Sequence, residues 1–125
     1  MIWSAIGAAA LGLGVAAGAF GAHGLRGRLD EYSMGIYERA VFYHFIHAIG
    51  LLAVPIFARL NVLSNAGSGR VCALLLAGIV LFSGSLYALA VSGIRTLGVV
   101  TPFGGIAFIV AWLLLAFELL RHSKT

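Results

Sequence analysis

The sequence is poor in charged residues. Only 10% of its 125 residues are charged and 62% are hydrophobic, whereas an average soluble domain has about 25% charged residues. A small soluble domain has a large surface for its volume and needs polar residues to cover it. Composition therefore excludes a soluble globular domain, and the apolar excess excludes intrinsic disorder. It predicts an integral membrane protein in which residues 1–125 form a single membrane domain.

Cysteine and acidic residues are also scarce. The single cysteine, Cys72, excludes an internal disulfide and a metal site built from cysteines. Four acidic residues are too few for most two-metal chemistry. The nucleophile elbow, the P-loop, the dinucleotide glycine fingerprint and the metalloprotease helix are all missing. We therefore expect a protein that is not an enzyme, without catalytic residues, metal or cofactor.

Nucleic acid is not expected as a partner either. The net charge is +4, but no basic stripe with interleaved aromatic residues accompanies it. So few charges on so apolar a chain indicate loops that face lipid headgroups. Membrane lipids are therefore the expected partners.

What the sequence does have is four long apolar stretches, each near the length of about 20 residues that crosses a bilayer. Charged residues bound them, and they cover approximately residues 2–22, 40–58, 71–93 and 99–120. They are too long, and alternate too little, for the strands of a membrane barrel. Backbone groups in lipid must be satisfied within their own segment, so the stretches are expected to be helices. Short connections predict antiparallel neighbours, and thus an all-α four-helix bundle.

Small residues recur at helical spacing and predict close helix packing. A ladder with a step of four residues runs along the first stretch, and two adjacent glycines open the fourth: Ala10, Gly14, Gly18, Ala22, Gly104 and Gly105. Such faces let helix backbones approach one another where no hydrophobic effect drives association. The pattern favours packing of the helices within one chain, and the alternative is a homo-oligomer interface.

Polar residues inside the apolar stretches are the candidates for function, because burying them in hydrocarbon is costly. Antiparallel helices bring the end of the first and third stretches to the same side as the start of the second and fourth. One leaflet therefore collects a candidate polar pocket of His23, His44, His47, Tyr87, Ser92 and Thr101. His44 and His47 are three residues apart and share a helix face.

The histidines have several interpretations. Each can be an interhelical hydrogen-bond partner, and together with Glu38 they can line a proton or ligand pathway. His44 and His47 with His23 can also coordinate a metal, although no glutamate follows His44 as in a metalloprotease. His23 with a histidine of the second stretch is a further possibility, as a haem ligand pair.

Orientation rests on a tied count of basic residues. One side has Arg59, Arg70, Arg121 and Lys124, and the other has Arg26, Arg28, Arg39 and Arg95. Because Arg39 follows Glu38 and is expected to lie within the second helix, we expect both termini in the cytoplasm.

Four segments carry a family resemblance. They are G-A-F-G-A-H-G-L at 18–25, Y-x-x-A-V-x-Y-H-x-x-H-A-I-x-L-L at 37–52, F-S-G-S-L-Y at 82–87, and P-x-G-G-x-x-F at 102–108, followed by Trp112. In order and spacing they resemble the YgdD-like family of small bacterial inner-membrane proteins, a domain of unknown function similar to mitochondrial transmembrane protein 256.

The resemblance implies a multi-pass inner-membrane protein without an established activity. The family pattern falls on His23 and His47, and less firmly on His44. Three hypotheses of function follow from the sequence. The first is a non-enzymatic scaffold or assembly subunit. The second is binding or transport of a small solute, protons or lipid through a pocket around His23 and His47. The third is a redox protein that binds metal or haem.

Overall fold

The computed structural model describes residues 1–123, and their secondary structure is helical. In chain order the elements are α1 (Ile2–Phe20), η1 (Gly21–Leu25), α2 (Glu31–Arg59), α3 (Asn65–Gly78), η2 (Ile79–Ser83), α4 (Gly84–Ser92), η3 (Arg95–Val99) and α5 (Thr101–Ser123). The segments η1 and η2 are π-helical and η3 is a 3₁₀-helix.

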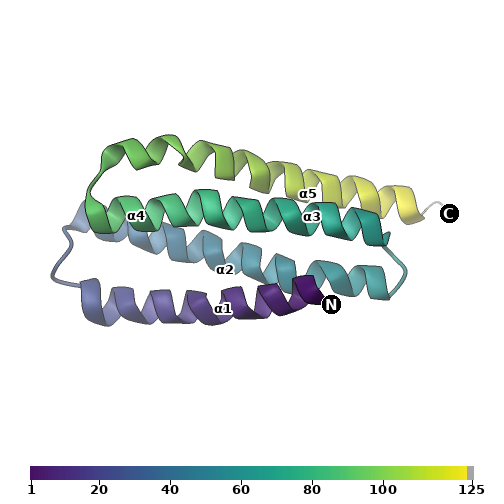
Figure 1. Ribbon diagram of the computed structural model, residues 1–125, viewed down its shortest axis with the longest axis horizontal. Helices are drawn as coiled ribbons and strands as arrows, with labels where there is room; N and C mark the ends of the chain where they lie inside the picture. Colours follow the sequence, from purple (N-terminus) through teal and green to yellow (C-terminus); the bar gives the residue numbers. More distant parts are fainter. Residues whose placement is uncertain (124–125) are drawn as a thin grey trace.

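These elements join into four long rods that run alternately up and down (Figure 1). Four stretches are long and apolar enough to cross a membrane: Ile2–Leu25, Glu31–Arg59, Asn65–Ser92 and Arg95–His122. The prediction of an all-α membrane bundle with antiparallel neighbours is confirmed. We call the two ends of the bundle the Met1 end, where α1 begins and α2 ends, and the His23 end, where α1 gives way to η1.

The rods pack as successive neighbours. α1 packs along α2, α2 packs along α3, η2 and α4, and α5 packs along α3 and η2. The most apolar windows of the second and third rods are both 44% buried, against 22% for the first and 28% for the fourth. The first and last rods are therefore the outer ones, and most of their surface faces away from the protein.

Two helices begin earlier than the apolar stretches indicated. α2 starts at Glu31 instead of near residue 40, because Asp30 caps it and accepts a hydrogen bond from the Ser33 amide at 2.7 Å. α3 starts at Asn65 instead of near residue 71, where the Ser64 hydroxyl accepts from the Gly67 amide at 3.0 Å. Side-chain caps satisfy amides that would otherwise lack partners, so they extend these helices into polar sequence.

The cap of α2 predicts a measurable pH response. The hydrogen bonds from Ser33 hold the pKa of the exposed Asp30 carboxyl below its ordinary value of 3.8. A lowered native pKa means that the cap stabilises α2 above pH 3.8, and that this contribution is lost as the pH falls through the native pKa. We expect the protection of the Ser33 amide, its exchange rate compared with that of an unstructured amide at the same pH, to fall below the native pKa of Asp30 and to be low above it as well in Asp30→Ala. Hydrogen exchange by NMR measures both, with Glu31→Gln as the control. A carboxyl titration midpoint at or above 3.8 would contradict the assignment.

Candidate functional site

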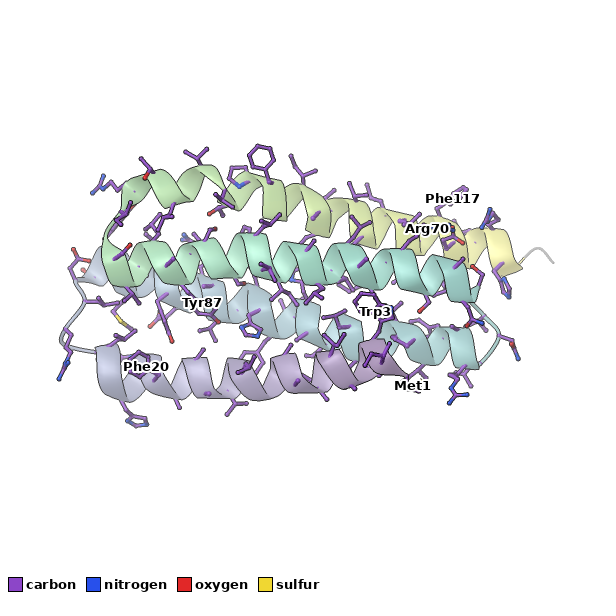
Figure 2. All side chains as sticks on the ribbon, viewed as in Figure 1. Met1, Trp3, Phe20, Arg70, Tyr87 and Phe117 are labelled. Atoms are coloured by element: carbon purple, nitrogen blue, oxygen red, sulfur yellow. The ribbon has the colours of Figure 1, made fainter. Side chains whose placement is uncertain are left out.

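His44 lies in the interior of the bundle and connects three rods. Its side chain extends from α2, its Nε2 lies 2.8 Å from the Ala10 carbonyl oxygen of α1, and its Nδ1 lies 2.8 Å from the Tyr87 hydroxyl of α4. Tyr87 is labelled in Figure 2, on the side of α4 that faces α1 and α2. His44 itself is only 7% exposed. A single buried imidazole therefore ties α1, α2 and α4 together.

The partners of His44 define its tautomer. A carbonyl oxygen only accepts, so Nε2 carries the proton and donates it to Ala10. In the neutral ring Nδ1 then accepts from the Tyr87 hydroxyl. Both ring nitrogens are used by the protein, which leaves no lone pair on this ring for a metal ion.

Other buried or half-buried hydroxyls repeat this arrangement. Ser4 of α1 donates to the Leu52 carbonyl at 2.9 Å, Tyr37 of α2 donates to the Ala17 carbonyl, and Ser83 of η2 donates to the Ala40 carbonyl at 2.8 Å. With His44, these bonds join α1 to α2 at three heights along their length and join η2 to α2. Each of these side chains donates a hydrogen bond to a backbone carbonyl of a neighbouring rod. It therefore needs no water as a partner, and the hydrocarbon of a bilayer contains none.

His47 has a different environment from His44. It lies parallel to Phe108 of α5, with ring centroids 3.4 Å apart, and its Nδ1 donates to the Tyr43 carbonyl of its own helix at 2.7 Å. Tyr43 and Trp112 complete the aromatic surroundings, with centroids 5.8 Å from that of His47. Although His44 and His47 are both buried on α2, one points to α1 and α4 and the other to α5.

The remaining candidates do not join these histidines. His23 is exposed in η1, and Ser92 is exposed and donates to the Ala88 carbonyl of its own helix. Thr101 lies 2.6 Å from the Ser85 hydroxyl, which links the start of α5 to α4. The sequence predicted one pocket around His23 and His47. In the structure His44 meets Tyr87, whereas His23, His47, Ser92 and Thr101 lie in separate environments, because the small residues of α1 that precede His23, and not His23, face α2.

The small-residue ladder is used within the chain. A methyl group on Gly14 would come within 3.2 Å of the Phe45 ring, and one on Gly18 within 3.8 Å of Val41, so both glycines face α2. Ala10 is buried on the same face, whereas Ala22 is exposed. Gly104 is buried where α5 crosses η2, while Gly105 next to it is in ordinary contact range of Phe82. The ladder therefore brings α1 against α2, and its role in a homo-oligomer stays a prediction that this geometry does not test.

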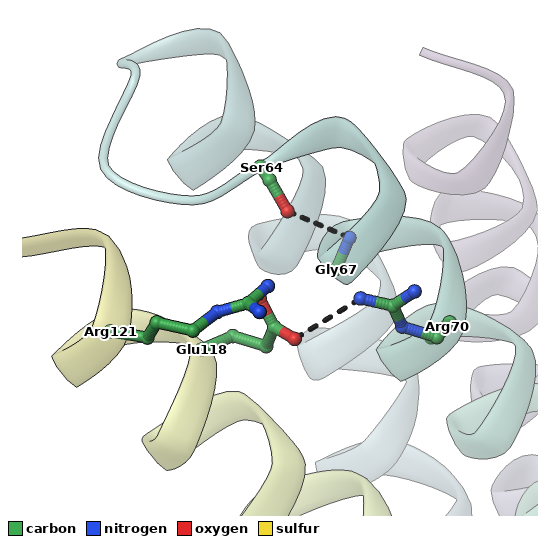
Figure 3. A network of polar contacts seen from close by, with 5 residues as sticks. All are labelled: Ser64, Gly67, Arg70, Glu118 and Arg121. Carbon is green, nitrogen blue, oxygen red and sulfur yellow. Dashed lines mark hydrogen bonds and ion pairs between the residues drawn. The ribbon is translucent and has the colours of Figure 1, made fainter. Parts of the chain in front are cut away.

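A charged network at the Met1 end escaped the sequence analysis. Glu118 of α5 is 3% exposed and forms ion pairs with Arg70 of α3 at 3.1 Å and Arg121 at 3.0 Å (Figure 3). The Glu118–Arg121 pair is visible in the sequence as an i,i+3 spacing, but Arg70 is 48 residues away from Glu118. A methyl group on Gly67 would lie 2.8 Å from the Glu118 carboxylate, which therefore packs against the first turn of α3. The network fastens the end of α5 to the start of α3.

The histidines do not gather with acidic or cysteine side chains into a metal site. Within residues 1–123 no group of three or more His, Cys, Asp or Glu side chains is placed to hold a metal ion. Cys72 is buried in the apolar core. A haem ligand pair of His23 with His44 or His47 also lacks a geometric basis, since His23 is exposed and both ring nitrogens of His44 are occupied.

The fold and these contacts define the class: a multi-pass membrane protein built as an all-helical bundle with an internally bonded polar interior. A family model described as "Protein of unknown function (DUF423)" matches residues 17–105, and the chain belongs to this family. The matched stretch contains His44, His47 and Tyr87. The expectation of a small bacterial membrane family of unknown function is confirmed. No solved structure matches the chain.

Relatives of similar length are named UPF0382 membrane proteins. The UPF0382 membrane protein YwdK of Bacillus subtilis is 44% identical over 111 residues, which is 88% of this chain and 89% of YwdK. A UPF0382 membrane protein of Staphylococcus epidermidis is 42% identical over 111 residues, covering 89% of this chain and 88% of its own. One from Staphylococcus saprophyticus is 45% identical over 103 residues, covering 82% and 83% respectively.

Proposed function

We propose that this protein is a non-enzymatic structural subunit of the bacterial inner membrane that assembles with copies of itself. The observation that carries the proposal is the hydrogen bonding of the polar side chains in the interior of the bundle. Among the described residues, no buried side-chain nitrogen or oxygen lacks a hydrogen-bond partner. A general acid or base has to come within hydrogen-bond reach of a substrate proton. The interior polar groups here bond to the protein instead, and three of them, Ser4, His44 and Ser83, hold one rod to another.

The outer rods indicate where assembly occurs. α1 uses one face for α2, and Leu13, Val15 and Phe20 are exposed among the residues that face away from it. Most of the other exposed residues of α1 are small: Ala5, Ala8, Ala9, Gly12, Ala16 and Ala19. The outer face of α5 instead carries exposed large side chains, among them Phe103, Ile106, Ile109, Leu113 and Phe117. Small faces suit close contact between membrane helices, while large apolar side chains suit lipid tails. The difference between the two outer rods favours α1 as the contact between copies.

Cysteine cross-linking in native membranes tests the assembly. In a Cys72→Ala background, Gly12→Cys is placed at mid-height on the outer face of α1, and Ile109→Cys serves as the matched control at mid-height on α5. We expect oxidation to give a covalent dimer through position 12 and monomer through position 109. Monomer at both positions, or equal dimer at both, would contradict the proposed contact.

A conduit remains the rival function, and a flux measurement separates the two. Liposomes that contain the protein are expected to leak protons and small solutes no faster than empty liposomes. A purely structural role would be contradicted if liposomes with the protein leak faster than empty liposomes and His47→Ala abolishes the difference.

A further inference from the structure

A groove opens between α1, η1 and α2 at the His23 end of the bundle. Its volume is about 190 Å³, and its lining includes Gly18, Gly21, Tyr37, Val41, Arg26 and Glu38. It lies apart from His44, His47 and the Glu118 network. Neither the structural role proposed above nor the family accounts for it.

The groove changes character along its length. Arg26 and Glu38 stand at its mouth, where η1 ends and α2 has completed its first turns, whereas Gly18 and Val41 line it deeper along the rods. At about 1.5 Å per α-helical residue, the three residues from Glu38 to Val41 correspond to about 4.5 Å along the axis of α2. The groove therefore runs from the charged border of the membrane segment into its apolar part.

Glycine creates the depth of the groove. Gly18 has no side chain, and a methyl group there would touch only Val41, at 3.8 Å. Gly21 is covered by the Tyr37 ring, since a methyl group there would come within 2.5 Å of it. Away from the two charged residues the wall is thus backbone, the Tyr37 ring and the side chains of Val41 and Met34, which suits a hydrocarbon chain.

The charges at the mouth are opposite in sign and only loosely paired. The Arg26 guanidinium and the Glu38 carboxylate are 3.8 Å apart, and their side chains are 69% and 63% exposed. This separation is longer than a hydrogen bond, which ends at about 3.2 Å. Each group therefore keeps hydrogen-bonding capacity toward a ligand that brings the complementary charge.

We propose that this groove binds a phospholipid whose headgroup carries both a phosphate and a primary ammonium group. Arg26 pairs with the phosphate, Glu38 pairs with the ammonium, and one acyl chain lies along Gly18 and Val41. A primary ammonium donates hydrogen bonds to a carboxylate, which a trimethylammonium group does not. A headgroup with a phosphate and no cation is repelled by Glu38. The same two side chains thus select phosphatidylethanolamine over phosphatidylcholine and phosphatidylglycerol.

Native mass spectrometry of the full chain tests the selection. The purified protein is mixed with equal amounts of phosphatidylethanolamine, phosphatidylcholine and phosphatidylglycerol of matched acyl chains, and the bound lipids are counted. We expect phosphatidylethanolamine to be favoured by up to about fivefold, the scale of an exposed charge pair. Equal binding of the lipids, or preference for phosphatidylglycerol or phosphatidylcholine, would overturn the proposal.

Substitutions at the mouth of the groove are expected to change the binding of different phospholipids in opposite directions. Glu38→Gln is expected to lower the binding of phosphatidylethanolamine to the level of phosphatidylcholine and to raise the binding of phosphatidylglycerol. Arg26→Gln is expected to lower the binding of all three phospholipids. Ala22 is exposed and lines the groove, so Ala22→Leu fills it without disturbing the core and lowers binding of all three lipids. Glu31→Gln, exposed on the same helix as Glu38 but outside the groove, is the control and leaves binding unchanged. If Glu38→Gln behaves as Glu31→Gln does, or Ala22→Leu binds as wild type does, the site is wrong.

Discussion

Replacing Gly104 by alanine is expected to lower the free energy of unfolding by about 3 kcal/mol, the upper part of the range for overpacking a core. The added methyl group would lie 2.3 Å from the Phe82 amide nitrogen and 2.8 Å from its α-carbon. Those atoms belong to the backbone of η2, so no side-chain rotation relieves the clash. Either α5 moves away from η2 or the π-helical turn is rebuilt, and both break the contact that holds the last rod.

Gly84→Ala is the matched control for this substitution. Gly84 begins α4, directly after η2, and a methyl group there meets nothing within 4 Å. Alanine favours a helix over glycine by up to about 1 kcal/mol, so this variant should be neutral or slightly more stable. Reversible unfolding in detergent, followed by far-UV circular dichroism, measures both variants. Equal stability of Gly104→Ala and Gly84→Ala would contradict the close approach of α5 to η2.

His44→Leu is expected to cost about 2 kcal/mol, whereas His47→Phe is expected to cost less than about 1 kcal/mol. Leucine removes both hydrogen bonds of His44, each worth about 0.5–1.5 kcal/mol, and leaves the Tyr87 hydroxyl without its partner. Phenylalanine at position 47 keeps the ring that lies on Phe108 and gives up one bond within its own helix. A pocket built on both histidines would make the two substitutions similar in effect.

The same unfolding measurement distinguishes these outcomes. A greater loss of stability for His47→Phe than for His44→Leu would contradict the roles assigned to the two residues. A loss of proton or solute flux in His47→Phe at unchanged stability would do so as well, because it would place function at His47 without a structural cause.

The fold can be predicted from the sequence because few backbone structures can cross a bilayer. A chain with four apolar stretches of spanning length and short connections has to pair antiparallel helices, and the structure has them. The helix starts were harder to predict. Glu38 and Arg39 look like the border of a span, but Asp30 caps a helix that carries both of them on its exposed surface.

The polar contacts are harder to predict from the sequence than the fold, because their acceptors are not marked by residue type. His44, Tyr37 and Ser83 donate hydrogen bonds to backbone carbonyls, and every residue has a carbonyl. Which one is reached depends on the rotation of each rod about its axis. The π-helical turn at Ile79–Ser83 alters that rotation in the middle of the third rod, and the one at Gly21–Leu25 alters it at the end of the first, where periodicity alone assumes a regular helix. Hence the partners of these polar residues could not be predicted from the sequence.

The central claim is that buried polar side chains such as His44 bind the helices to one another. A double-mutant cycle between His44→Leu and Tyr87→Phe, read from unfolding free energies in detergent, tests it most directly. Their hydrogen bond of 2.8 Å predicts a coupling free energy of about 0.6–1.7 kcal/mol, the range for interhelical bonds in membrane proteins. Strictly additive effects of the two substitutions, with no coupling between them, would contradict the claim.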